Sequence, residues 1–370
     1  MEDKGIELSE VKPHLEVVGA ITAELYRKKD DKHVSYRFGY SWNLASEEAR
    51  SFIEQIEAKF RRKNKSHSHL EKNDLANSVP TYLRLYIDEQ YDFEKLSDKL
   101  ASRIVSEAND KGRSVAEVKV VFIHYHPPGS IVQEDGRGKV LVVMVDKKGV
   151  FDFDEKTLEP KTVESIDTDA LRQAASYDLN LFDVDYPKNE GAAYLQFIEG
   201  KSTSSFFKDA LGCQEKIDNK KSAEQLFIAL DKFMGDNEID IPTREKIRDA
   251  IQDYLETKRK SPDKSVKLEN IQHVVDKQLS EEHQAQGKFT DYVNENGYEV
   301  NHTFEFSSQS ARKGAFMTIV DEENDDFELK VYKNSVGKHG SGKPIMLDST
   351  GQYLMVPVDE KKIKELGISD

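Results

Sequence analysis

The chain has 370 residues, with 54 Lys and Arg against 69 Asp and Glu, so its formal net charge is −15 at pH 7. This length favours two domains over one, and an apolar share of 37% supplies ordinary cores and excludes a disordered composition. The acidic balance excludes strong long-range attraction to a polyanion such as DNA. Charges more than about 8 Å apart in solvent are mostly screened, so a local basic patch is still able to bind one.

We expect neither a secretion signal nor a membrane span. Its opening stretch, MEDKGIELSE, is acidic and polar, without the basic and apolar regions of a secretory signal. The longest clean apolar run, VLVVMV at 140–145, is far shorter than the roughly twenty residues of a membrane helix. The single cysteine, Cys213, cannot form an internal disulfide, which is typical of a reducing compartment. We expect a soluble, cytoplasmic protein.

The first part of the chain alternates strand and helix patterns. Residues 17–27 and 34–40 predict two strands joined by a charged turn. Ser46 is placed to cap a helix, because apolar residues recur at helical spacing from 52 to 60. A second helical pattern begins at Pro80 and continues to a stop near residue 112.

Two longer strands are predicted next, at 116–126 and 139–154, the second containing a hairpin turn at 146–149. Helical patterns dominate from about residue 200. They predict helices at 222–235, 242–260, 268–279 and 289–296. From 314 the chain returns to strands, in AFMTIV, FELKVY, GKPIMLD and YLMVPV, before a last short helix after Asp359.

The predicted fold class is therefore α+β, in three parts. Residues 1–190 form an α+β domain with a mixed or largely antiparallel sheet. Residues 191–305 form a helical domain, and residues 306–370 form a small β-rich segment that packs on the rest.

The best catalytic candidate is FIHYHPPG at 122–129. His124 and His126 share one face of a predicted strand and could both bind one metal ion, with Asp152 and Asp154 as further ligands. Two His at this spacing are a weak signal. The alternative places His124 in the sheet as a packed or hydrogen-bonded residue and His126 in the turn. A metal-dependent hydrolase built on these residues is the weakest hypothesis.

Other catalytic patterns are incomplete. Carboxylate-x-Lys occurs at 117–119 and 328–330, without the further acids of a nuclease site. GSGK at 340–343 lacks the spacing of a nucleotide-binding phosphate loop and predicts a loop between strands. Cys213 has no evident His partner, which predicts a buried thiol. We expect no enzyme and no cofactor.

One stretch, KFRRKNKSHSHLEK at 59–72, runs against the acidic balance, with six Lys and Arg, two His and one acid. It begins in the last turn of the predicted helix, where cations complement the negative end of the helix dipole, and HSH at 67–69 is expected in a solvated loop. The charge exceeds what helix capping requires, so we interpret the stretch as an anion-binding patch. Its predicted phosphate contacts are Arg61, Arg62, Lys63 and Lys65. Secondary candidates, for which a solvated helix end is favoured, are Lys258, Arg259, Lys260, Arg312 and Lys313.

Two segments share a pattern of aromatic, leucine and glycine residues, YLQFIEGKSTSSFFKDALGC at 194–213 and FTDYVNENGYEVNHTF at 289–304. Together with VVGAITAELYR at 17–27 and HY at 124–125, this pattern resembles the bacterial nucleoid-associated protein family of the NdpA/YejK type. The resemblance implies a cytoplasmic protein associated with the bacterial chromosome, and it supplies no catalytic residues. The shared residues are mainly packing and turn positions, so they favour the fold more than an activity.

Two functional hypotheses remain in front. The first is a nucleoid-associated protein that binds DNA without strong sequence preference through local basic patches. The second is an acidic protein-interaction subunit that reaches the nucleoid through a DNA-processing partner, or mimics DNA towards it. A homodimer is expected on base rates alone. Basic stretches that converge on one face would favour the first hypothesis, and cations scattered among acids would favour the second.

Overall fold

A computed structural model shows how the chain folds. It describes residues 15–28, 31, 33–111, 118–127, 136–146, 152–162, 171–199, 205–213, 218–306, 316–320, 328–332 and 335–358. These residues fall into two compact units. Unit 1 is formed by the described residues of Met1–Asp218 and Lys267–Phe304, and unit 2 by those of Asn219–Val266 and Glu305–Asp370. The α+β class is confirmed, and the three-part domain division stays a prediction.

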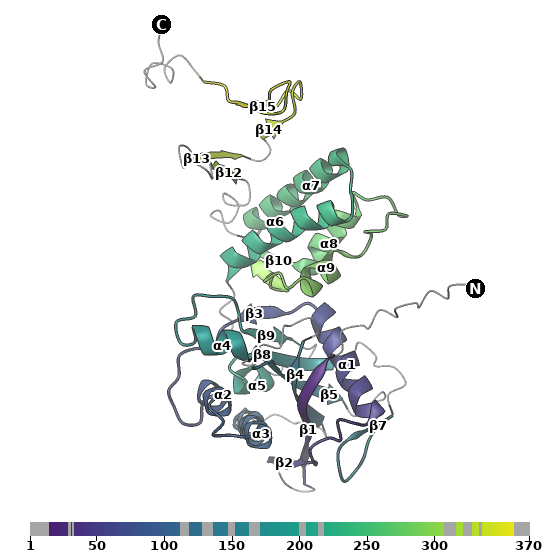
Figure 1. The fold of residues 1–370 in the computed structure, drawn as a ribbon, viewed down its shortest axis with the longest axis vertical. Helices are drawn as coiled ribbons and strands as arrows, with labels where there is room; N and C mark the ends of the chain where they lie inside the picture. Colours follow the sequence, from purple (N-terminus) through teal and green to yellow (C-terminus); the bar gives the residue numbers. More distant parts are fainter. Residues whose placement is uncertain are drawn as a thin grey trace, which may run out of the picture. The chain divides into compact units, whose positions relative to one another are not determined.

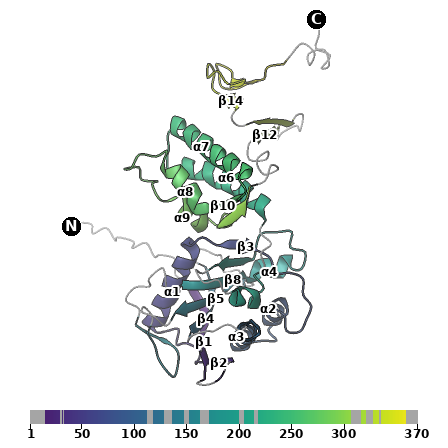
Figure 2. The same cartoon turned by 180° about the vertical axis from the view of Figure 1, so that it is seen from behind.

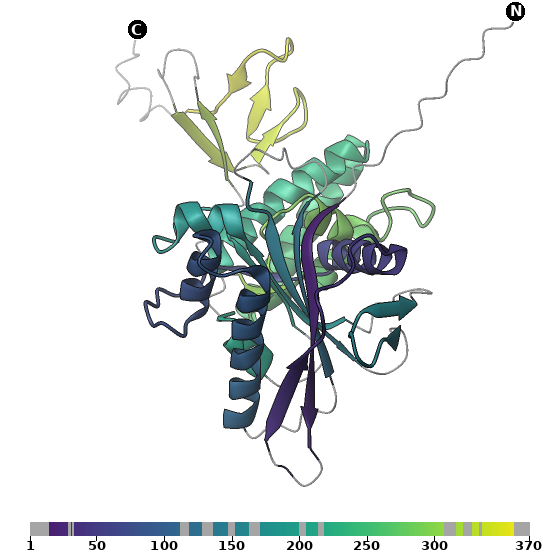
Figure 3. The ribbon, with the colours of Figure 1, turned by 60° about the horizontal axis from the view of Figure 1, so that its bottom comes forward.

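Unit 1 is built on a seven-stranded sheet with the order β2-β1-β4-β5-β8-β9-β3, in which every pair is antiparallel. Its strands are β1 (Glu16–Arg27), β2 (Val34–Phe38), β3 (Ser66–Ser68), β4 (Val118–His126), β5 (Lys139–Asp146), β8 (Leu171–Asp178) and β9 (Leu195–Ile198). Figure 3 shows the long purple β1 and its hairpin partner β2 at one end of this sheet.

Helices cover both faces of the sheet. They are α1 (Glu47–Arg62), α2 (Val79–Ile87), α3 (Phe93–Asp110), α4 (Leu179–Asp185) and α5 (Phe206–Ala210). Along β4, Val120 and Phe122 pack in a core with α2 and α3, whereas Val121 and Ile123 pack in a second core with α1. The strand is therefore apolar on both faces. Figures 1 and 2 show α1 on one side of the sheet and α2 and α3 on the other.

The predicted helix after Ser46 is confirmed as α1, and the hydroxyl of Ser46 accepts the N–H of Ala49 as an N-cap. The single pattern predicted from 80 to 112 is wrong in one respect, because it folds as two helices. The chain turns between them with Glu89 in the left-handed region (φ 57°), and Asp92 then caps α3 by accepting the N–H of Lys95.

Two shorter helices, α8 (Leu268–Asp276) and α9 (Phe289–Glu295), complete unit 1, as the helical patterns predicted. A separate pair of strands, β6 (Asp152–Phe153) and β7 (Pro160–Thr162), also belongs to this unit. The predicted hairpin turn at 146–149 extends beyond the described residues.

Unit 2 contains the predicted pair of long helices, α6 (Asn219–Asp236) and α7 (Ile241–Lys260). Arg248 of α7 donates to Asp231 of α6 at 3.0 Å. The short strands β10 (Ser265–Lys267) and β11 (Thr303–Glu305) lie where the chain passes between the units.

The predicted C-terminal strands of unit 2 are confirmed. They are β12 (Phe316–Val320) and β13 (Glu328–Tyr332), followed by β14 (Val336–Gly337), β15 (Ile345–Leu347) and β16 (Leu354–Met355). The short helix predicted after Asp359 lies outside the described residues.

Candidate nucleic-acid interface

The C-terminal end of α1 carries the exposed part of the predicted patch. Side chains of Arg61 and Arg62 are 46% and 62% exposed, and Lys63 is half-buried. Each arginine faces a carboxylate. The Nε of Arg61 lies 3.6 Å from Glu57, and the Nε of Arg62 lies 2.7 Å from Glu295 of α9. The Arg62–Glu295 pair lies at the surface, where an ion pair contributes only about 0–1 kcal/mol, so Arg62 can exchange Glu295 for another anion. Glu57 is buried, so Arg61 would leave a buried carboxylate behind if it left its pair.

Lys65 lies inside the protein, with only 3% of its surface exposed. Its ammonium donates to the carbonyl of Arg61 at 2.8 Å and lies 5.5 Å from the centre of the Phe60 ring. Burial, together with the positive charge of Lys139, lowers the pKa of Lys65 to about 7. In this position Lys65 contributes to the interior of unit 1 and presents no ammonium to a phosphate.

The expectation that HSH at 67–69 lies in a solvated loop is wrong, because Ser66–Ser68 form the edge strand β3. Ser66 pairs with Phe197 and Ser68 with Leu195 of β9. A second segment covers the other edge of β3, where Asn301 accepts the N–H of His67 at 2.6 Å. His67 is buried as a result. Partners this far along the chain leave no local signal in the sequence.

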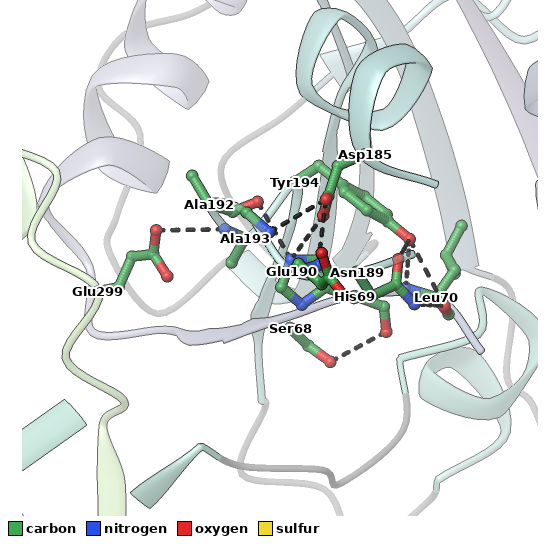
Figure 4. Close-up of polar contacts among 11 residues, drawn as sticks. Ser68, His69, Leu70, Asp185, Asn189, Glu190, Ala192, Ala193, Tyr194 and Glu299 are labelled. Atoms are coloured by element: carbon green, nitrogen blue, oxygen red, sulfur yellow. Dashed lines mark hydrogen bonds and ion pairs between the residues drawn. The ribbon is translucent and has the colours of Figure 1, made fainter. Parts of the chain in front are cut away.

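His69 belongs to a polar cluster that fixes the segment between α4 and β9 (Figure 4). Its Nε2 lies 3.1 Å from the carbonyl oxygen of Ala192 and 3.4 Å from a carboxylate oxygen of Asp185. The other oxygen of Asp185 accepts the N–H groups of Glu190 and Gly191. This network joins β3 to the segment before β9, which gives His69 a structural role.

The secondary candidates also face acids. At the end of α7 in unit 2, Lys258 lies 3.4 Å from Asp263, and Arg259 lies 2.7 Å from Glu256. Lys260 next to them is exposed. The last two candidates, Arg312 and Lys313, lie outside the described residues. Four of the described candidates therefore each face an acid at one of two helix ends, namely Arg61, Arg62, Lys258 and Arg259.

The metal candidates are occupied by other contacts. His124 is buried, its Nδ1 lies 2.6 Å from the hydroxyl of Tyr86, and its Nε2 lies 2.7 Å from the carbonyl of Arg137. A carbonyl only accepts, so Nε2 carries the proton and Nδ1 accepts from the tyrosine. Burial lowers the pKa of His124, which keeps the ring neutral. This matches the alternative in which His124 is a hydrogen-bonded residue of the sheet.

The remaining metal candidates do not form a ligand set with His124. The His126 ring centre lies 5.9 Å from that of His124, and Asp154 accepts the N–H groups of Lys156 and Thr157 in a turn. The side chain of Asp152 is not among the parts that the structure describes. Among the described residues, no group of three or more His, Cys, Asp or Glu is placed to hold a metal ion.

Comparison with known proteins gives the family. The family of nucleoid-associated protein YejK matches residues 24–340 of this chain. The chain belongs to that family. A nucleoid-associated protein of Shewanella pealeana is 28% identical over 144 residues, which cover 38% of this chain and 39% of that protein. One of Pseudomonas entomophila is 23% identical over 223 residues, covering 59% of this chain and 60% of the relative. The matched part thus spans less than two thirds of these relatives.

Membership of the YejK family confirms the resemblance seen in the sequence. Residues that carried it, among them Tyr194, Leu195, Phe197, Phe206 and Phe207, are buried in the core of unit 1. They pack β9 and α5 into the core of unit 1. No helix in the described part of the chain is long and apolar enough to cross a membrane.

Sequence reasoning missed the acid that faces the patch. Glu295 lies 233 residues after Arg62, and α9 brings it to the end of α1. The acidic residues of α9 were visible in the sequence, but nothing local assigned them to α1.

Proposed function

We propose that this member of the YejK family is a non-catalytic nucleoid protein that binds DNA weakly and without strong sequence preference. Arg61, Arg62 and Lys63 at the end of α1 make the phosphate contacts. The supporting observation is that the two arginines are exposed and that Arg62 holds a surface ion pair that a phosphate can replace. Contacts to phosphate carry no sequence information, so we expect binding without strong sequence preference.

The expected affinity is modest for two reasons. Three cations neutralise about three phosphates, which gives a log–log salt slope of about −3 and strong weakening at physiological salt. The formal charge of −15 opposes any broader contact with DNA.

The test is fluorescence anisotropy of a short duplex DNA across a salt series. The variant carries Arg61→Ala, Arg62→Ala and Lys63→Ala. Its control carries Lys95→Ala, Lys156→Ala and Lys188→Ala, which remove the same charge from exposed positions elsewhere in unit 1. We expect the magnitude of the log–log salt slope to fall by about 2–3 in the first variant only. Equal loss in both variants would mean that net charge, and not the end of α1, decides the binding.

The second candidate function is attachment to the nucleoid through a DNA-processing protein. The observation in its favour is that Arg61, Arg62, Lys258 and Arg259 each face a carboxylate. Lack of DNA binding by the wild-type chain at low salt, with nucleoid association retained in cells, would select this function. Sedimentation of the purified chain tests the homodimer expected on base rates.

A further inference from the structure

Unit 2 contains a basic, glycine-containing loop that the proposed function does not use. It comprises 338–344 (KHGSGKP) and joins β14 to β15, which pair in parallel. The prediction that GSGK lies in a loop between strands is confirmed. Lys338 and His339 are exposed, Lys343 is half-buried, and the loop contains no acid. Figure 3 shows this small sheet in yellow.

The backbone of this basic loop has a defined conformation. Ser341 donates its N–H to the carbonyl of Lys338 at 3.0 Å, which closes a turn. The loop folds back on Gly337, because a Cβ at that position would overlap the hydroxyl of Ser341. Gly340 and Gly342 have φ of +75° and +72°, which glycine adopts readily.

This alternation of left-handed glycines with ordinary residues is the backbone pattern of anion-binding nests, in which successive N–H groups face one concavity. Within the described chain, the N–H groups of Gly340 and Gly342 donate to no other backbone or side-chain group. The same short loop also carries the cations Lys338 and Lys343 and the exposed His339.

The next loop of the same sheet shows what such N–H groups bind. Between β15 and β16, one oxygen of Asp348 accepts the N–H groups of Gln352 and Tyr353, and the other accepts the N–H of Thr350. Bonds from Thr350 and Tyr353 lower the pKa of Asp348 to about 2, so the captured group is a carboxylate anion. That loop also has a left-handed glycine, Gly351. It supplies its own anion, and the basic loop does not.

We propose that the basic loop at 338–344 is a phosphate-binding site, in which the N–H groups of Gly340 and Gly342 and the side chains of Lys338, His339 and Lys343 bind a phosphate group. The phosphate belongs either to the backbone of DNA or to a free phosphate compound. The site shares no residue with the end of α1, so it is tested independently of the proposed function.

The experiment titrates the ¹⁵N-labelled full chain with inorganic phosphate and follows the amide signals of Gly340 and Gly342, with sodium chloride at equal ionic strength as the blank. Both signals are expected to shift to saturation with phosphate only. Lys338→Ala with Lys343→Ala removes charge, and Gly342→Ala removes the left-handed glycine but keeps the charge. Each is expected to weaken binding about fivefold or more. Gly351→Ala places the same strain in the loop that holds Asp348 and is expected to leave phosphate binding unchanged.

Anisotropy of duplex DNA with the same variants separates the two sources of phosphate. Weaker DNA binding assigns the site to the DNA backbone, and unchanged DNA binding assigns it to a free phosphate compound. Shifts that do not saturate with phosphate, or variants that bind phosphate as the wild type does, overturn the proposal. The triple alanine variant of α1 is expected to retain phosphate binding, so failure of one site is told apart from failure of the other.

Discussion

Replacing Lys65 by methionine tests the energetic cost of its buried ammonium. Burial lowers its pKa from 10.5 to about 7, so the unfolded chain binds more protons than the folded chain between these values. The free energy of unfolding of the wild type therefore rises with pH in this interval, by about 2 kcal/mol between about pH 6.5 and about pH 8.5. At the lower pH the buried charge costs folding up to about 5 kcal/mol.

Lys65→Met keeps the apolar stem and removes this cost. It also removes the hydrogen bond to the carbonyl of Arg61, which contributes about 1 kcal/mol. We expect a net stabilisation of about 2–4 kcal/mol near pH 6.5, and loss of the wild-type rise with pH. Burial raises the pKa of the Cys213 thiol, so above about pH 9 the folded chain binds more protons than the unfolded chain and the free energy of unfolding falls with pH. The measurement therefore stays below about pH 9.

Urea unfolding followed by tryptophan fluorescence is the assay. Trp42 is the single tryptophan and is 4% exposed. Its ring centre lies 5.3 Å from that of Phe52 in α1, so its fluorescence reports on unit 1. Lys63→Met, at a half-buried position just before Lys65, is the control and is expected to change stability by about 0.5 kcal/mol or less. A Lys65→Met chain that is less stable at pH 6.5, or that keeps the wild-type pH dependence, would show that the ammonium is compensated inside the protein.

Three further predictions concern other parts of unit 1. Glu295→Gln releases Arg62 and is expected to raise DNA affinity by up to about fivefold at low salt, measured by anisotropy; unchanged affinity would remove Arg62 from the phosphate contacts. Gly39→Ala is expected to cost about 2 kcal/mol or more in urea unfolding, because its Cβ would overlap the backbone carbonyl of Thr157; a neutral result would mean that this turn moves freely. Cys213 is 2% exposed with a raised pKa, so alkylation followed by mass spectrometry should proceed about a hundredfold more slowly than in the urea-unfolded chain, and equal rates would contradict its burial.

Elements with local signals could be predicted from the sequence. The helix α1 follows from the capping Ser46 and from apolar residues at helical spacing, all within one short segment. Strand β3 could not be predicted, because its three polar residues gain their structure from β9, far along the chain. The turn that separates α2 from α3 depends on Glu89 in a left-handed conformation, which few sequence patterns announce.

The same distinction applies to the candidate interface. The cations at the end of α1 were found from charge alone, and two of them are exposed as a phosphate contact requires. The burial of Lys65 could not be foreseen, since it follows from the pairing of the next residues with β9. The acids opposite Arg61 and Arg62 come from a neighbouring turn and from α9, and only the second needed the tertiary fold.

The cover over β3 has a consequence for synthesis on the ribosome. Asn301, which closes the outer edge of β3, lies 234 residues after His67, and α6 and α7 of unit 2 are translated in between. An open strand edge can pair with another chain. During translation the outer edge of β3 therefore stays uncovered until the residues around 301 have left the exit tunnel. A nascent chain stalled after α7 should expose it, whereas a full-length chain should not.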